Sequence, residues 1–213
     1  RIVRQNYFEL KKDDAENRYK MPTSGFPLIY NHWYAAERNI SKEFILKQLH
    51  LMPSYGFDAF VLDDGWFDNL DDWNPDPKLF APNELENALA AVKNDGVTVG
   101  IWSAPWLLSG ISTKTKKEID PHGYYNKYMK ATAIDFFGTN FNTRLYNHID
   151  YISNDLSANW WKYDQQFLND NTKHGKMKNI IAFQQALDSV RKEFPELIIE
   201  NCRPGGHKHK DLI

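Results

Sequence analysis

Five short apolar runs divide the chain, and the segments between them have a different periodicity. The runs lie at residues 27–31, 57–62, 97–102, 159–163 and 197–200. Runs of this length, rich in β-branched and aromatic residues, are typical of strands. A further strand is expected at residues 132–136, inside a turn-rich stretch from 103 to 141.

In the segments between these runs, apolar residues recur every three or four positions, which predicts helices with one apolar face. The four faces are formed by Ile45, Leu49 and Met52; by Leu85, Leu89 and Val92; by Leu145, Ile149, Ile152 and Leu156; and by Ile180, Phe183, Leu187 and Val190. Ser41 is the expected N-cap of the first helix, and Gly56 is its expected end.

The alternation of strands and helices predicts an α/β fold with a parallel sheet and crossover helices. A doubly wound nucleotide binder should carry a glycine-rich turn after its first strand, but residues 31–36 contain no glycine. The distinctive polar and aromatic residues instead fall where strands end, which favours a (β/α)8 TIM-barrel type. A barrel needs eight strands, so we expect an incomplete one over residues 27–213, with about the first five βα units. Residues 1–26 are interpreted as a lead-in segment.

Composition narrows the function classes. The net charge of −2 argues against a nucleic-acid partner, and no apolar run is long enough for a membrane span. A single cysteine among 213 residues excludes an internal disulfide and favours a cytoplasmic location. The aromatic content of 15% could supply stacking surfaces for flat-faced ligands as well as core packing.

The segment Val61-Leu62-Asp63-Asp64-Gly65-Trp66-Phe67 carries the strongest local signal. An apolar strand here delivers two adjacent carboxylates and then an aromatic ring to the sheet edge. Adjacent carboxylates repel and need donor-rich partners, and a sugar with neighbouring hydroxyls is one such partner. The alternative, with about even weight on these residues alone, is that Asp-Asp-Gly only ends the strand in a turn. The second acidic and aromatic stretch at residues 71–73 favours a site.

A second signal is Trp160-Trp161-Lys162-Tyr163-Asp164. Lys162 and Asp164 are two positions apart on a strand, so their side chains share one face. A neighbouring cation keeps a carboxylate ionised, as a nucleophilic aspartate requires. The alternative is an internal ion pair with no role in chemistry.

The segment from Glu200 to Asp211 is the third candidate. Its cysteine, Cys202, is expected to fill a small buried space, since no partner for a catalytic thiol can be assigned. His207 and His209 lack a third ligand, so a metal site is not expected, and no cofactor is implied. Gly205 and Gly206 suggest that the backbone passes close to a ligand or another loop.

These residues together resemble the catalytic barrel of glycoside hydrolase family 36 α-galactosidases, in the melibiase clan. Asn31-His32-Trp33 resembles the first-strand Asn-x-Trp of that family, and residues 60–67 are close to its second-strand signature. Gly100-Ile101-Trp102 is similar to its third-strand motif, Lys162-Tyr163-Asp164 to the segment that carries the nucleophile, and Cys202 with Gly205-Gly206 to its fifth-strand motif. The likeness covers the chain from about residue 20 onward.

The resemblance implies a retaining α-galactosidase that acts on galactoside oligosaccharides by double displacement. It assigns Asp164 as the nucleophile and Asp63 and Asp64 as ligands of the C4 and C6 hydroxyls. It also implies that Trp33 and Trp102 wall the pocket and that Lys162 binds ring hydroxyls and keeps Asp164 charged. Cys202 and Gly205 would face the C2 side of the sugar.

The chain also departs from the family pattern. The acid/base aspartate of the family follows its sixth strand, which is expected beyond Ile213, and Asp211 matches only a loop aspartate. Residues 1–213 alone are therefore expected to have little activity. The departures in the loop from Cys202 to Lys210 leave open an α-N-acetylgalactosaminidase or a galactosyl transferase.

Two readings outside this chemistry remain. One is a non-catalytic sugar-binding barrel remnant. The other, with about one chance in twenty, is a barrel acting on phosphorylated metabolites. Because an open sheet leaves unpaired strand edges, a homo-oligomer is also possible.

Overall fold

The computed structural model describes residues 27–110, 125–127, 129–137, 139–164 and 174–202. Its main sheet has five parallel strands, which are β1 (Ile29–Asn31), β2 (Ala59–Leu62), β3 (Thr98–Ser103), β7 (Trp160–Tyr163) and β8 (Ile198–Asn201). The strands lie side by side in chain order, β1-β2-β3-β7-β8. A doubly wound sheet would place later strands on both sides of the first. The order is that of consecutive barrel strands, as the sequence predicts.

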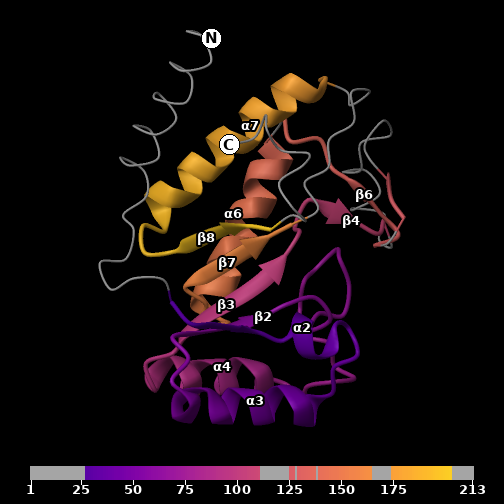
Figure 1. Ribbon diagram of the computed structural model, residues 1–213. Coiled ribbons are helices and arrows are strands. Elements are labelled where there is room, and N and C mark those ends of the chain that lie inside the picture. Colours follow the sequence, from indigo (N-terminus) through magenta and orange to yellow (C-terminus); the bar gives the residue numbers. More distant parts are fainter. Residues whose placement is uncertain (1–26, 111–124, 128, 138, 165–173, 203–213) are drawn as a thin grey trace, which may run out of the picture.

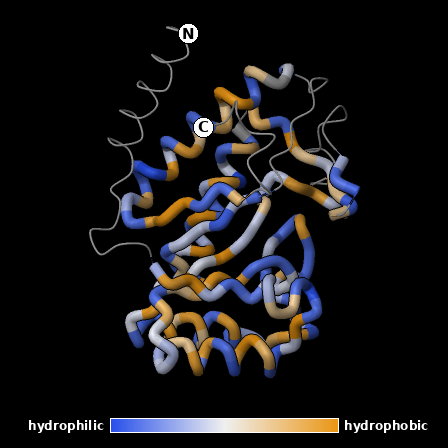
Figure 2. The backbone as a smooth tube through the Cα atoms, viewed as in Figure 1, coloured by the Kyte–Doolittle hydropathy of each residue, from blue (hydrophilic) through white to orange (hydrophobic). Residues whose placement is uncertain are grey.

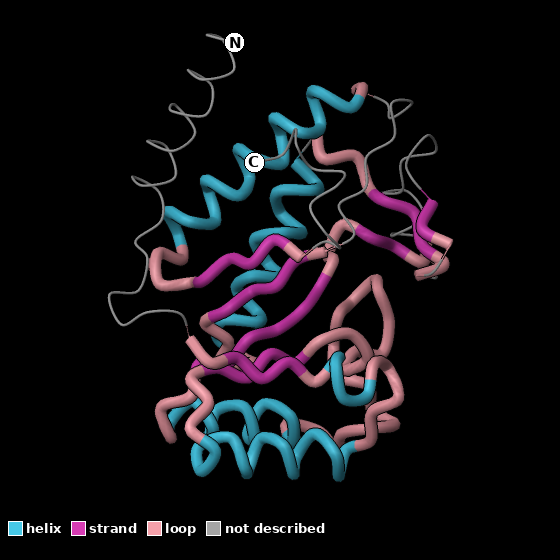
Figure 3. Tube along the Cα trace, viewed as in Figure 1, coloured by secondary structure: helices cyan, strands magenta, loops and turns pink. Residues whose placement is uncertain are grey.

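Four long helices connect these strands, and a short one follows β1 (Figure 1). They are α3 (Lys42–Tyr55), α4 (Glu84–Asn94), α6 (Thr139–Asn154), α7 (Lys176–Glu193) and the short α2 (Trp33–Ala36). A small antiparallel sheet, in the order β4-β6-β5, is built from β4 (Leu107–Leu108), β5 (Tyr125–Asn126) and β6 (Ala131–Ala133). It lies on the side of the molecule toward which β3 points (Figures 1 and 3).

The helix α3 shows how the local sequence sets these elements. The Ser41 hydroxyl accepts a hydrogen bond from the Phe44 N–H at 3.2 Å and so caps the first turn. The expected apolar face is buried, and Gly56 ends the helix with φ at +72°, a conformation that glycine adopts without strain. In Figure 2, orange and blue segments alternate along α3 and α4, as expected for helices with one buried face.

The two faces of the main sheet have different surroundings. One face packs under the helices in the main core, with Phe60 and Leu62 of β2, Ile101 of β3, and Trp161 and Tyr163 of β7. Because side chains alternate along a strand, the residues between these point to the opposite face. In a barrel, that second face is the interior.

The interior face is closely packed around Gly100. In the strand register, this glycine stands between Val61 and Trp160. A Cβ atom at Gly100 would lie 2.9 Å from Val61 Cγ2 and 3.3 Å from Trp160 Cβ. Only a residue without a side chain fits there, and the chemistry-bearing side chains lie beyond this layer, at the carboxyl ends of the strands.

Some boundaries differ from the expectation. The strand β6 covers Ala131–Ala133 rather than 132–136, and α6 begins at Thr139, six residues before its expected apolar face. The elements α2, β4 and β5 were not expected, since two to four residues carry no periodicity. The lead-in segment 1–26 lies outside the described residues. None of the helices in the described ranges is long and apolar enough to cross a bilayer.

Candidate active site

Three strands place charged side chains together at their carboxyl ends on the interior face. Asp63 directly follows β2 and has the orientation of Val61, whereas Lys162 and Asp164 continue the alternation of Trp160. Lys162 pairs in register with Trp102 on one side and Glu200 on the other. These residues therefore lie at one mouth of the curved sheet, as the barrel hypothesis requires.

Asp63 is the centre of this group. Its Oδ2 accepts hydrogen bonds from Lys162 Nζ at 2.7 Å and from Asn31 Nδ2 at 2.8 Å. Its Oδ1 accepts a bond from the Asp64 N–H at 2.9 Å. The Asp63 and Lys162 side chains are only 6% and 10% exposed. Burial lowers the pKa of Lys162, but the Asp63 charge and hydrogen bond outweigh it, so the net shift is upward and the ammonium stays charged.

A buried histidine fixes the chain beside this carboxylate. His32 Nδ1 accepts a hydrogen bond from the Asp63 N–H at 2.9 Å, so its Nε2 carries the proton and donates to the Glu37 carbonyl at 3.2 Å. Burial lowers the pKa of His32, which keeps the ring neutral in this role. His32 thus holds the end of β2 against the segment after β1.

The second carboxylate of the pair has a different partner. Asp64 Oδ2 lies 2.6 Å from an Arg38 guanidinium nitrogen, and the two residues line a hollow of about 310 Å³ together with Gly65, Phe67 and Met129. The other oxygen, Oδ1, is buried and has no hydrogen-bond partner in the described part of the chain. Burial raises the pKa of Asp64 to about 6, although Arg38 opposes this shift.

The raised pKa predicts how stability depends on pH. The ordinary pKa of this carboxyl is 3.8, so between about pH 4 and 6 the folded chain binds more protons than the unfolded one. Its contribution to stability therefore grows as the pH falls through 6, where the buried charge is neutralised. Relative to Asp64→Asn, which is neutral throughout, the free energy of unfolding of the unmodified protein should rise by about 2 kcal/mol from pH 7 to pH 4. Urea unfolding of both proteins at several pH values measures this, and a constant difference would contradict it.

Asp164 and Cys202 lie at the same mouth. The charge of Asp164 contributes to raising the pKa of Asp64, which places the two carboxylates in one electrostatic environment. Burial, followed by the Asp164 charge, raises the pKa of Cys202 to about 12, so the thiol stays protonated and is no nucleophile. The Cys202 N–H donates to the Tyr163 carbonyl at 2.8 Å, which ties the chain after β8 to the strand that ends in Asp164.

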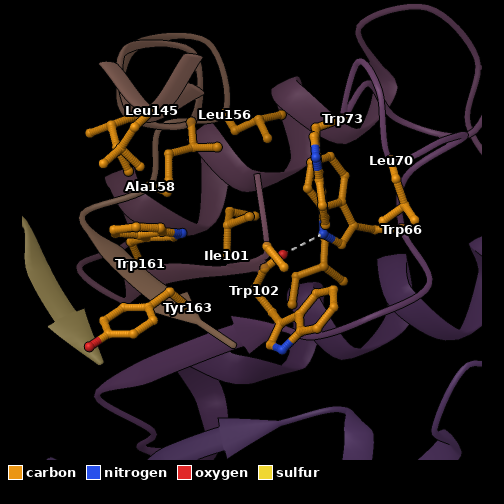
Figure 4. Packing of buried hydrophobic residues seen from close by; sticks show 14 of the residues in the cluster. Trp66, Leu70, Trp73, Ile101, Trp102, Leu145, Leu156, Ala158, Trp161 and Tyr163 are labelled. Atoms are coloured by element: carbon orange, nitrogen blue, oxygen red, sulfur yellow. Dashed lines mark hydrogen bonds between the residues drawn. The ribbon is translucent and has the colours of Figure 1, made fainter. Parts of the chain in front are cut away.

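The two tryptophans proposed as pocket walls differ in exposure. Trp33 is half-buried on α2, and its backbone N–H donates to Asn31 Oδ1 at 2.9 Å. Trp102 is 2% exposed and stacks on Phe67 with ring centroids 6.2 Å apart, while its carbonyl accepts a bond from Trp66 Nε1 at 3.1 Å (Figure 4). The ring of Trp102 is therefore held rigidly at the end of β3.

Part of the predicted site cannot be placed. Gly205, His207, His209 and Asp211 lie outside the described residues. Within the described ranges, no three or more His, Cys, Asp or Glu side chains are grouped as metal ligands.

The family assignment rests on comparison with known proteins. The family model described as Melibiase matches residues 2–212 of this chain. The chain belongs to the melibiase family. Among melibiase relatives, the alpha-galactosidase of Escherichia coli is 24% identical over 201 residues, which cover 84% of this chain and 28% of that enzyme. Alpha-galactosidase Mel36A of Lactobacillus acidophilus has the same identity and coverage over 202 residues.

Solved melibiase structures have the same fold. The alpha-galactosidase from Lactobacillus brevis superimposes with a TM-score of 0.71 at 20% identity, over 85% of this chain and 27% of that one. The GH36 alpha-galactosidase AgaA from Geobacillus stearothermophilus gives 0.67 at 21% identity, over 85% and 28%. The predictions of family 36 membership and of a partial barrel are confirmed. The chain spans little more than a quarter of the length of these relatives.

Several residues of this site were not singled out by the sequence. Asn31 and Glu200 were noticed only as parts of motifs, although both belong to the interior face. Glu200 Oε2 accepts a bond from Trp160 Nε1 at 2.9 Å, and strand alternation could have predicted that orientation. Arg38 gave no signal, because its contact with Asp64 joins positions 26 apart, on either side of α3 and β2.

Proposed function

We propose that the protein to which this chain belongs is a retaining α-galactosidase, with Asp164 as the nucleophile. The observation that supports this proposal is the buried Lys162–Asp63 pair on the interior face, at the mouth where Asp164 directly follows β7. Such a group presents fixed donors and acceptors to a small polyhydroxylated ring. Relatives named alpha-galactosidase support the reaction class, and AgaA variants from Geobacillus stearothermophilus were solved with raffinose and with stachyose.

In the proposed reaction, a carboxylate oxygen of Asp164 forms a bond to the anomeric carbon while the bond to the leaving oxygen breaks. A second carboxyl, about 5 Å away, protonates that oxygen and then removes a proton from the water that hydrolyses the glycosyl-enzyme. We assign this acid/base to a part of the full-length protein outside residues 1–213. The ion pair of Lys162 with Asp63, and the hydrogen bonds that Asp63 makes, keep these two side chains in place during both steps.

The sugar is proposed to be bound by the two carboxylates and the aromatic walls. Asp63 and Asp64 would take the C4 and C6 hydroxyls, and Lys162 a neighbouring ring hydroxyl. The Oδ1 of Asp64 is buried and has no hydrogen-bond partner in the described part of the chain, so a hydroxyl that reached it would meet an unsatisfied acceptor. Trp33 and Trp102 would flank the apolar face of galactose, and Cys202 with Gly205 would face C2.

Two assays test this proposal. Full-length protein supplied with p-nitrophenyl α-galactoside should release galactose that proton NMR shows first as the α anomer. Residues 1–213 alone, without the assigned acid/base, should release little. First release of the β anomer would contradict the retaining mechanism, and full activity of residues 1–213 would contradict the assignment of the acid/base.

A further inference from the structure

A second hollow lies on the other side of the sheet from Asp63 and Lys162. It has a volume of about 410 Å³, which is within the range of small-molecule sites. One wall is the loop after β2, with Asp72 and Trp73, and the other is one side of α6, with Asn140, Thr143, Asn147 and Tyr151. At its base, His148 Nε2 is 2.6 Å from Ser103 Oγ, which also accepts a bond from Trp161 Nε1 at 2.8 Å. The lining of this hollow comes from α6 and from the loops after β2 and β3, and it includes none of Asp63, Lys162 and Asp164.

The helix side of this hollow has an unusual residue choice. The α6 positions that line it recur every three or four residues, so they form one continuous stripe. Exposed helix positions commonly carry Glu, Lys, Gln or Arg, which favour helix formation, whereas Asn and Thr disfavour it. Here Asn140, Thr143 and Asn147 are exposed and offer short amide and hydroxyl groups. Such groups can both donate and accept hydrogen bonds.

The charges around the hollow favour a neutral ligand. Its lining holds one guanidinium, Arg144, and two carboxylates, Asp71 and Asp72. Burial lowers the pKa of His148 to about 3, so this ring adds no charge at neutral pH. A phosphate would meet more negative than positive charge. Amides, a hydroxyl, a carboxylate and aromatic edges together are suited to the hydroxyls and C–H faces of a saccharide.

The loop wall is held in place before any ligand arrives. Asp71, 6% exposed, accepts bonds from the Ser109 hydroxyl at 2.7 Å and from the Ser109 N–H at 3.0 Å, and its carbonyl accepts one from Arg144 at 2.9 Å. Trp73 has φ at +57°, which is strained for a residue with a side chain. Its buried indole N–H has no acceptor in the described part of the chain, which is unfavourable for a buried donor. Strain and an unmet donor at the same residue are features that gather at binding sites.

We propose that this hollow, between the loop Asp71–Trp73 and the polar stripe of α6, is a second binding site for a neutral saccharide. It is distinct from the proposed catalytic site and does not require that site to be active. Trp73 packs on both sides, with its ring 5.7 Å from His148 and 5.9 Å from Trp102. A saccharide in the hollow would therefore contact Trp73, which packs against Trp102.

The test measures raffinose binding by calorimetry in full-length protein that carries Asp63→Asn and Lys162→Met. These changes remove both charges of the buried pair and are chosen to abolish sugar binding at the interior mouth. We expect this background to retain one raffinose site, and Asn147→Ala to weaken it about tenfold through loss of amide hydrogen bonds. Asn142→Ala is the matched control, since Asn142 is exposed on α6 and does not line the hollow. It should leave the affinity unchanged.

Thr143→Ala provides a second variant, and inorganic phosphate is the competing probe. No raffinose binding in the Asp63→Asn, Lys162→Met protein, equal affinities for Asn147→Ala and Asn142→Ala, or displacement of raffinose by phosphate would each overturn the proposal. Failure of the proposed catalytic function gives a different result. In that case the unmodified protein and the Asp63→Asn, Lys162→Met protein would bind raffinose at the same number of sites. Only the substitutions on α6 would then weaken raffinose binding.

Discussion

Replacing Lys162 by methionine should lower the free energy of unfolding by about 3 kcal/mol or more. The change removes the ammonium that lies 2.7 Å from Asp63 Oδ2 and leaves a carboxylate that is only 6% exposed. Asn31 and the Asp64 N–H still donate to it, so we expect the lower end of the range of about 3–5 kcal/mol for breaking a buried pair. Urea unfolding followed by circular dichroism measures the loss.

A double-variant cycle separates loss of the charge pair from loss of packing. Asp63→Asn with Lys162→Met removes both charges, and it should recover most of the stability that Lys162→Met alone loses. Lys42→Met is the matched control, because Lys42 also pairs with a carboxylate, Glu84, but its side chain is 39% exposed. That variant should lose much less stability than Lys162→Met, because an exposed ion pair is screened by solvent. Equal losses for Lys42→Met and Lys162→Met would contradict the description of Lys162 and Asp63 as a buried pair.

Asp164→Ala should lower kcat of the full-length protein on p-nitrophenyl α-galactoside by about 10⁴-fold or more. Without this carboxylate no glycosyl-enzyme can form, while the groups proposed to bind the sugar remain. The Michaelis constant should therefore change little. The unfolding midpoint should also change little, because Asp164 is only half-buried at the end of β7. Steady-state kinetics and thermal unfolding of the same preparations measure both quantities.

Addition of azide distinguishes the nucleophile from a residue that acts indirectly. A small anion can enter the space left by the alanine and attack the anomeric carbon in place of the carboxylate. We expect azide to restore part of the rate in Asp164→Ala and to give β-galactosyl azide. Asp135→Ala, at a half-buried aspartate after β6, serves as the control and should keep its activity without azide. A loss in Asp164→Ala of tenfold or less would exclude the proposed role.

The order of elements could be predicted because periodicity is a local property. The apolar stripe of α3, with its Ser41 cap and terminal glycine, needs no tertiary information. The start of α6 was missed, since threonine and asparagine, at positions 139 and 140, are poor helix formers and precede the apolar face. The short α2, β4 and β5 depend on tertiary packing, which no spacing rule captures.

The candidate site could be predicted as a set of residues but not as a set of contacts. Strand ends and alternation place Asp63, Lys162 and Asp164 at one mouth, and the structure agrees. The sequence paired Lys162 with Asp164, whereas the ion pair that the structure shows for Lys162 joins it to Asp63, across β3. Proximity across neighbouring strands depends on register, which a single sequence does not fix.

The two adjacent carboxylates also differ more than their positions suggest. Asp63 accepts hydrogen bonds from Lys162 and Asn31, whereas Asp64 pairs with Arg38 and lines a hollow with it. Asp64 lies in the turn after β2, and the Asp63 charge still contributes to raising its pKa, so the two carboxylates have different partners but remain neighbours. Burial raises the pKa of Asp64 against the opposing effect of Arg38, and one of its buried oxygens has no hydrogen-bond partner in the described part of the chain.

The covalent intermediate provides the most direct test of the account. Full-length protein incubated with 5-fluoro-α-galactosyl fluoride should accumulate a glycosyl-enzyme, because the fluorine at C5 slows both steps while the fluoride leaving group at C1 keeps the first step fast. Peptide mass spectrometry should then find one added fluorosugar on the carboxylate of Asp164, and none in Asp164→Ala. A label on any other residue of an enzyme that is fully inactivated would contradict the assignment of Asp164 and the site built around it.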